Sequence, residues 1–169
     1  TVEATKNKKI GIIGTETTVN SRMYVKLIQE LEPEAKVIGK ACPLFVPLVE
    51  EGWTKDPVTE EVARRYLADL QQSDIDSLIL GCTHYPLLRS MVGEIMGDKV
   101  TLVNPAYETA LELKALLEKE GMANDGENKN FENPYEFFVS DAADKFKTFA
   151  NSILPADVTS IKQINIEEY

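Results

Sequence analysis

The sequence has 169 residues, 43% of them apolar, which is enough for a domain with a real core and argues against general disorder. Its net charge of −10 repels nucleic acids and anionic membranes, so we expect neither as a partner. No apolar run approaches the roughly 20 residues of a membrane-spanning helix, and no secretory signal opens the chain. With only two cysteines, these features predict a cytoplasmic location.

Apolar clusters alternate with amphipathic stretches along the chain, which is typical of an α/β fold on a mainly parallel sheet. The strands of the first hundred residues are expected at 9–14, 36–39, 75–81 and 100–103. The helices between them are expected through 24–31, from 43 to 52, from 57 through 70 and from 86 through 95. A further helix is predicted from Pro105 to Gly121. This pattern predicts a four-stranded sheet flanked by helices.

The C-terminal part differs in composition. The stretch 122–133 is polar and rich in turn residues, so we expect an exposed connection there. Beyond it we expect a strand at 135–140, a helix around Phe146 and Phe149, and an extended piece over 158–166. This strand-helix-strand piece is small for an independent core. It therefore needs a neighbour, either the first domain or a part of the protein outside this chain.

Ligands of open parallel sheets bind beyond the carboxyl ends of the strands. Three such ends carry polar or reactive residues: 14–21, 41–43 and 81–84. The last is the most informative, because a thiol facing a helix N-terminus favours its thiolate form. His84, the single histidine of the chain, follows Cys82 in the same turn. Its imidazole can donate a hydrogen bond to a substrate carboxylate or exchange a proton with the thiol.

Each candidate also has a purely structural interpretation. Cys82 can be a small buried side chain at the end of a strand, and for Cys42, which has no histidine nearby, that interpretation is favoured. Without a CxxC motif a redox pair is a weak hypothesis, and one histidine with two separated cysteines predicts no metal site. The loop 14–18 can bind an anion or cap a helix. The pair Glu50 and Glu51 can be a solvated helix end or can tune a nearby histidine.

The segment LGCTHYPLL, at 80–88, resembles the second cysteine motif of the cofactor-independent aspartate/glutamate racemases. The histidine after Cys-Thr is the form that the glutamate racemases of this family carry. Three more segments are similar to the same family in the same order: IGIIGT from residue 10 with Thr18 and Ser21, ACPLFVPLVE at 41–50, and FFVSD at 137–141. The resemblance therefore covers nearly the whole chain.

The resemblance implies proton transfer between two thiols without a metal or pyridoxal phosphate. One thiolate removes the α-proton of glutamate, and a thiol on the opposite face returns one. Cys82 would be one of these bases, and His84 would help to move its proton with support from Glu50. The implied site residues are Cys82, His84 and Glu50 for catalysis, and Thr83, His84, Thr18 and Thr15 for substrate binding.

The chain also departs from the family pattern. Family members are longer and contain two similar α/β domains, and their first catalytic cysteine lies in an Ala-Cys-Asn-Thr motif that is not present here. Cys42 does not replace it, because the family carries the Ala-Cys-Pro segment in addition to both catalytic cysteines. We therefore expect residues 1–104 to be the second domain, and residues 105–169 to be a C-terminal portion that completes the first. The chain would be inactive alone.

The expected function of the intact protein is that of a glutamate racemase supplying D-glutamate for peptidoglycan. Its expected partners are glutamate, the N-terminal portion of the same protein and a second copy in a homodimer. Two alternatives stay open: a racemase of aspartate or another amino acid from the same superfamily, and a non-catalytic glutamate-binding domain. A thiol-dependent hydrolase is disfavoured, because no oxyanion motif accompanies Cys82.

Overall fold

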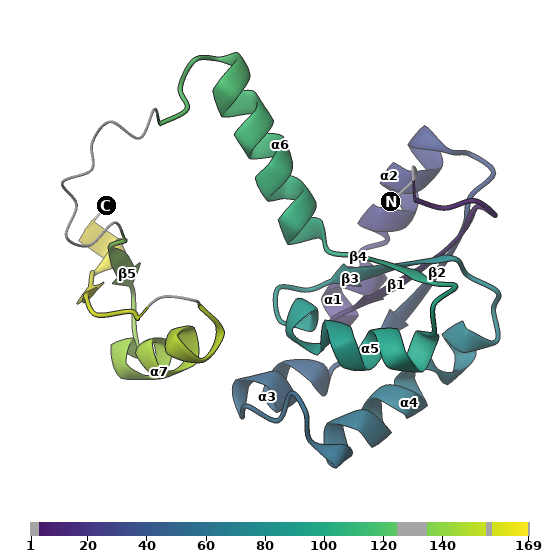
Figure 1. Cartoon of the computed structure of the whole chain (residues 1–169), viewed down its shortest axis with the longest axis horizontal. Helices are drawn as coiled ribbons and strands as arrows, with labels where there is room; N and C mark the ends of the chain where they lie inside the picture. Colours follow the sequence, from purple (N-terminus) through teal and green to yellow (C-terminus); the bar gives the residue numbers. More distant parts are fainter. Residues whose placement is uncertain (1–3, 125–134, 155–156, 169) are drawn as a thin grey trace. The chain divides into compact units, whose positions relative to one another are not determined.

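A computed structural model describes residues 4–124, 135–154 and 157–168. The chain divides into two compact units between Gly121 and Met122. The first unit is built on a four-stranded parallel sheet and the second on a two-stranded parallel sheet (Figure 1). The predicted α/β class and the four-stranded parallel sheet are confirmed.

Strand β1 lies inside the sheet of the first unit, between β2 and β3. The strands are β1 (Lys9–Gly14), β2 (Lys36–Ala41), β3 (Ser77–Gly81) and β4 (Thr101–Val103). Their order in the sheet is β2-β1-β3-β4, so β1 pairs with both β2 and β3. All four predicted strands are present, with β2 ending two residues later and β3 beginning two residues later than expected.

Helices cover both faces of this sheet. They are α1 (Glu16–Asn20), α2 (Met23–Leu31), α3 (Phe45–Glu50), α4 (Pro57–Gln71), α5 (Arg89–Met96) and α6 (Pro105–Lys119). Figure 1 shows α2 on one side of the sheet and α3, α4 and α5 on the other. The predicted starts at Pro57 and Pro105 are confirmed: each proline is the first helical residue, and the residue before it, Asp56 or Asn104, caps the helix with its side chain.

The core lies on both sides of the central strands because successive strand side chains point to opposite faces. On one face Ile10 and Ile12 of β1 pack with Ile28 of α2. Leu78 of β3 and Leu67 of α4 are also fully buried. Burying such side chains contributes roughly 1.5–3 kcal/mol each, so the sheet and its helices are the stable frame of the first unit.

One helix of the first unit was not anticipated. The structure inserts the short helix α1 between β1 and α2, because Arg22 adopts a positive φ of 55° that separates the two helices. Thr15 caps α1, since its hydroxyl accepts a hydrogen bond from the Thr18 amide at 3.3 Å. The helix-capping interpretation of the loop 14–18 is therefore confirmed, and anion binding there stays a prediction.

The second unit consists of β5 (Phe137–Val139), α7 (Ala143–Ile153), β6 (Ile161–Gln163) and the 3-10 turn η2 (Ile166–Glu168). The predicted strand-helix-strand order is confirmed, and the two strands are parallel. Its core is small: Ala150 and Val158 are buried, and the rings of Phe137 and Phe146 lie 6.0 Å apart. The predicted connection 122–133 falls mostly outside the described residues.

Helix α6 carries several exposed apolar side chains. None of its residues, all of which the structure describes, is buried, and four large apolar side chains are about half exposed or more: Tyr107, Leu111, Leu113 and Leu116. The contacts group α6 with the first unit, while the predicted division after Asn104 stays a prediction. Within the described residues, no helix combines the length and apolarity needed to cross a bilayer.

The glycine that ends β3 has a steric reason. Gly81 lies opposite Gly14 of β1, and a Cβ at position 81 would lie 2.9 Å from the carbonyl oxygen of Ile13. That oxygen is part of the backbone of the central strand, so it cannot move aside without breaking the pairing. Only glycine therefore lets β3 approach β1 at the point where the Cys82 turn begins.

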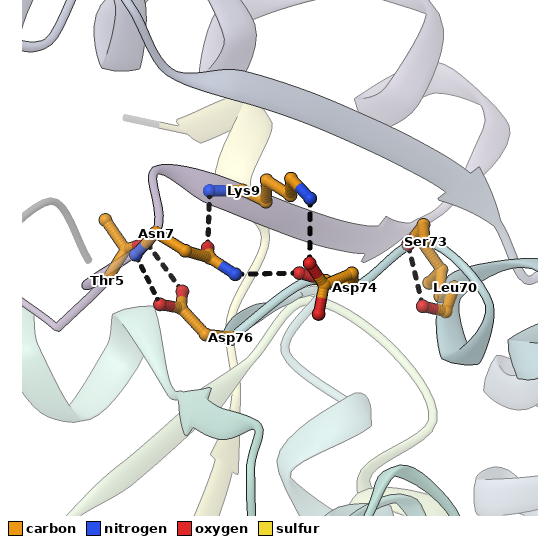
Figure 2. Close-up of polar contacts among 7 residues, drawn as sticks. All are labelled: Thr5, Asn7, Lys9, Leu70, Ser73, Asp74 and Asp76. Carbon is orange, nitrogen blue, oxygen red and sulfur yellow. Dashed lines mark hydrogen bonds and ion pairs between the residues drawn. The ribbon is translucent and has the colours of Figure 1, made fainter.

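At the amino-terminal ends of the strands, Asp76 holds the segment that leads into β1. Its carboxylate accepts hydrogen bonds from the Thr5 hydroxyl at 2.6 Å and from the amides of Lys6 and Asn7 at 2.6 and 2.8 Å. Figure 2 shows Thr5 and Asn7 meeting this carboxylate. Burial alone would raise the pKa of Asp76, but these hydrogen bonds outweigh it and hold the pKa below its usual value.

Substitution Asp76→Asn is expected to lower the free energy of unfolding by about 1 kcal/mol at neutral pH, because the amide cannot accept all of these bonds. Since the folded-state pKa of Asp76 is lowered, its contribution is present above the unfolded pKa and is lost as the pH falls. The difference between wild type and variant should therefore shrink below about pH 4. Urea unfolding across this range measures it. Asp74→Asn is the matched control. Asp74 is an exposed partner of Lys9, so this substitution should have little effect. A difference in free energy of unfolding between wild type and Asp76→Asn that does not change with pH would contradict the account.

Substitution Gly81→Ala is expected to destabilise the protein by about 1–3 kcal/mol, since the new methyl group meets backbone rather than a movable side chain. Gly93→Ala is the matched control. Its Cβ would lie 3.5 Å from a Leu102 methyl group, an ordinary contact, and it replaces glycine inside helix α5. This control should be neutral or stabilising by up to about 1 kcal/mol. Equal effects of both substitutions on urea unfolding would refute the steric argument.

Candidate functional site

Three strand ends meet at the carboxyl edge of the sheet. The register places Gly14 of β1 opposite Ala41 of β2 and Gly81 of β3. The amide of Cys42 then donates to the carbonyl oxygen of Gly14 at 2.9 Å, which joins the segment after β2 to the end of β1. The candidate residues that follow these strands are therefore gathered at one edge, as the parallel topology predicts.

The turn after β3 brings a thiol, a hydroxyl and an imidazole together. The Cys82 Sγ lies 4.0 Å from Nδ1 of His84, and the Thr83 hydroxyl oxygen lies 3.2 Å from the same nitrogen. Cys82 is partly exposed and is not in a disulfide. The thiol can therefore be reached from solvent and has a proton acceptor beside it.

Glu50, the last residue of α3, reaches the other side of the imidazole. Its Oε1 lies 3.4 Å from Nε2 of His84. A carboxylate at Nε2 favours a proton on that nitrogen and leaves the lone pair of Nδ1 directed towards Cys82 and Thr83. This arrangement allows the Cys82 proton to pass to His84, with Glu50 stabilising the imidazolium that results.

The helix predicted from Pro86 through Ile95 is present, but its first turn is not α-helical. The residues after His84 form a 3-10 turn, η1 (Tyr85–Leu88), and α5 begins only at Arg89. The amide of Leu87 bonds to the carbonyl of His84 at 3.1 Å, the i to i+3 pattern of a 3-10 turn. Because the macrodipole acts within one turn of the helix end, the imidazole is the nearer influence on the thiol.

Cys42 differs sharply from Cys82, although both follow strands of the same sheet. Cys42 is fully buried, and its thiol contacts the Lys40 carbonyl at 3.7 Å. Burial raises the pKa of Cys42 to about 12, although the positive charge of Lys40 opposes this effect. A thiol in this environment keeps its proton, so the structural interpretation of Cys42 is supported.

The two predicted threonines lie at the end of β1. Their hydroxyl oxygens are 3.0 Å apart, and the Thr18 side chain also packs against the site where a Cβ of Gly14 would be. They are thus next to the strand end that precedes Cys82, and their role in substrate binding stays a prediction. In the described parts of the chain, no three His, Cys, Asp or Glu residues gather as metal ligands would.

Sequence reasoning missed an aromatic cluster beside the site. Tyr85 and Phe45 are fully buried, and the hydroxyl of Tyr85 donates to the carbonyl oxygen of Cys42 at 2.8 Å. The available signal was a tyrosine placed between His84 and Pro86, inside a turn where an exposed polar residue is more usual. Periodicity alone does not identify such a residue, because it belongs to neither a strand nor a regular helix.

Comparison with known proteins gives consistent matches. Residues 1–112 match the profile of a family described as Asp/Glu/Hydantoin racemase. A glutamate racemase of Geobacter metallireducens is 41% identical over 164 residues, which are 96% of this chain and 59% of that relative. One of Neisseria meningitidis serogroup A is 43% identical over 163 residues, which are 96% of this chain and 58% of that relative.

Solved structures agree with these matches. The crystal structure of a glutamate racemase isoform from Bacillus anthracis has a TM-score of 0.87 and 35% identity, and the match covers 98% of this chain and 60% of that one. That of the Francisella tularensis glutamate racemase in complex with D-glutamate has a TM-score of 0.83 and 31% identity, covering 96% and 59%. The chain therefore spans about 60% of the length of the relatives it matches.

The two thiols are expected to react at very different rates with iodoacetamide at mildly alkaline pH. Cys82 should be alkylated first, because it is partly exposed and lies beside an imidazole, whereas Cys42 is buried and stays protonated well above this pH. Intact mass with peptide mapping identifies the modified residue. Cys42→Ser should retain one rapid modification and Cys82→Ser should lose it. Faster modification of Cys42 in the folded chain would contradict this assignment.

Proposed function

Because this chain belongs to the Asp/Glu/hydantoin racemase family, we propose that it contributes Cys82 as one of the two proton-transferring thiols of a glutamate racemase. The observation that carries the proposal is the line of contacts from the Cys82 thiol through His84 to Glu50, at 4.0 and 3.4 Å. The relatives named glutamate racemase, at 41 and 43% identity, support glutamate as the substrate.

The proposed reaction inverts the α-carbon of glutamate by two proton transfers. The Cys82 thiolate removes the α-proton, forming an S–H bond, and the electrons of the broken C–H bond spread into the adjacent carboxylate. A thiol on the opposite face then donates its proton to the α-carbon and becomes a thiolate. The atoms and charges balance without a cofactor, and the reverse reaction returns Cys82 to its thiolate form and the opposite group to its thiol form.

His84 and its neighbours set the protonation state of Cys82 in this proposal. The Nδ1 atom takes the thiol proton before the reaction, and Glu50 at Nε2 stabilises the positive charge on the ring. The Thr83 hydroxyl lies 3.2 Å from Nδ1, and in this proposal it would bind a substrate carboxylate beside the thiol. Thr15 and Thr18 would line the same edge from the end of β1.

The second thiol has to come from outside this sequence. Cys42 is unsuitable because it is buried and remains protonated. We place the second base in an N-terminal portion of the same protein, within the roughly 40% of the length of the relatives that this chain does not match. The second unit has only a small core of its own. It would therefore pack with that N-terminal portion and complete its domain.

Two further features support the proposed assembly and location. The exposed apolar side chains of α6 and the exposed stripe Met23, Leu27 and Leu31 of α2 are surfaces that a further domain or a second subunit would cover. The homodimer is proposed on this basis and on the family resemblance.

The proposed location is the cytoplasm, where the enzyme would provide D-glutamate for peptidoglycan. Both cysteines are unpaired, and a reducing compartment keeps thiols in that state.

Substitution Cys82→Ser, made in the protein extended by this N-terminal portion, is expected to lower racemisation at least about 100-fold in both directions, because the face of the substrate opposite the second thiol loses its base. Circular dichroism of glutamate follows the conversion from either enantiomer. Cys42→Ser is the control and should keep rates near those of the unsubstituted protein. Normal racemisation by Cys82→Ser would disprove the proposal, and a preference for aspartate would correct its substrate.

A further inference from the structure

We infer that Tyr85 is a positioning residue whose buried hydroxyl, bonded to the Cys42 carbonyl, sets how closely Glu50 approaches His84. The inference rests on the proposed function for its effect on catalysis. Its structural content, the geometry of one carboxylate and one imidazole, can be tested without any turnover.

The hydroxyl joins two segments that are far apart in the sequence. Tyr85 follows His84 directly, and its hydroxyl donates to the Cys42 carbonyl oxygen at 2.8 Å. The same carbonyl accepts the amide of Phe45 at 3.1 Å, while the amide of Cys42 donates to Gly14 at 2.9 Å. The loop between β2 and α3 is therefore held to the central strand on one side and to the turn after β3 on the other.

Phe45 connects this bond to Glu50 through its backbone, because its amide donates to the same Cys42 carbonyl oxygen. Phe45 is the first residue of α3 and Glu50 the last, so the position of Phe45 determines where Glu50 lies. The Phe45 ring packs edge to face against Tyr85, with centroids 5.2 Å apart, and against Tyr66 of α4, with centroids 5.4 Å apart. The start of α3 is thus enclosed between α4 and the turn that carries the imidazole.

The hydroxyl contributes what ring packing does not. Edge-to-face ring contacts tolerate a range of separations, whereas a hydrogen bond is restricted in both distance and direction. Burial raises the pKa of the Tyr85 phenol above its ordinary value, so the group remains a neutral donor throughout the pH range of a cytoplasmic enzyme. Without this donor, α3 can shift relative to His84 while the apolar contacts persist.

The test uses the ring of His84 as the reporter, because it is the only histidine of the chain. Histidine-selective ¹⁵N NMR at near-neutral pH then shows two ring nitrogens from one residue. Glu50→Gln defines the signals of a ring without its carboxylate. We expect Tyr85→Phe, which removes one oxygen, to move both signals towards those of Glu50→Gln. Tyr66→Phe removes the same atom from the other side of Phe45. Its hydroxyl accepts only a long bond of 3.4 Å from the Leu44 amide, so this variant should move the signals much less than Tyr85→Phe.

Wild-type ring signals in a folded Tyr85→Phe variant, even one with a lowered melting temperature, would overturn the inference and leave Tyr85 with a packing role only. Phe45→Leu is the second variant, because it keeps the hydroxyl bond and removes the ring contact. Its signals should stay near wild type. A shift as large as that of Glu50→Gln would show that ring packing, not the hydroxyl, sets the geometry.

Kinetics separate this inference from the proposed function. In the protein extended by the N-terminal portion, Tyr85→Phe should lower kcat about tenfold or more with little change in KM, because it displaces a group that acts on the thiol. Tyr66→Phe, which removes only the long bond from the Leu44 amide, should change kcat much less than Tyr85→Phe. If the unsubstituted protein does not racemise glutamate, the proposed function fails, while the NMR result still decides the role of Tyr85. An unchanged kcat in an active Tyr85→Phe variant would count against the positioning role of Tyr85.

Discussion

The register of β1 with its two neighbours determines where the parts of the site lie. Gly14 stands opposite both Ala41 and Gly81, so three parallel strands end together and their following segments share one edge of the sheet. The two glycines allow the close approach, because a side chain at position 81 would meet the backbone of β1. The thiol turn and the loop that leads to α3 both depend on this alignment.

This edge gives two cysteines different chemistry through their environments alone. Cys42 is enclosed and keeps its proton, whereas Cys82 is partly exposed and lies beside an imidazole whose other nitrogen contacts a carboxylate. Cys42 contributes through its backbone, since its carbonyl oxygen receives the Tyr85 hydroxyl. The buried, uncharged contact between Cys42 and Tyr85 thus lies beneath the partly exposed line of contacts from Cys82 to Glu50.

Much of the fold could be predicted from the sequence because local signals agree with the tertiary structure. The apolar runs of β1 and β3 are buried strands, and the caps Asp56 and Asn104 mark true helix starts. The proximity of Cys82 and His84 was also predictable, since two residues in one turn are always near each other. Such features depend on neighbouring residues, which a sequence displays directly.

Other features depend on long-range contacts or on unusual backbone geometry. The contact between Glu50 and His84 joins separate elements, so the residues alone left two interpretations of Glu50 open and the family resemblance favoured this one. The positive φ of Arg22, which separates α1 from α2, is not typical of arginine, and the 3-10 turn at Tyr85 carries no apolar period of its own. The role of Tyr85 required knowledge of which carbonyl its hydroxyl reaches.

The most direct test of the central claim is solvent deuterium incorporation during racemisation of L-glutamate by the protein extended by its N-terminal portion. With separate bases on the two faces, the proton removed from the substrate is not the one delivered to the product. We expect early D-glutamate to carry deuterium at the α-carbon while the remaining L-glutamate stays unlabelled, and Cys82→Ser to abolish the conversion. Equal labelling of both enantiomers from the start, or labelling that does not need Cys82, would contradict the account.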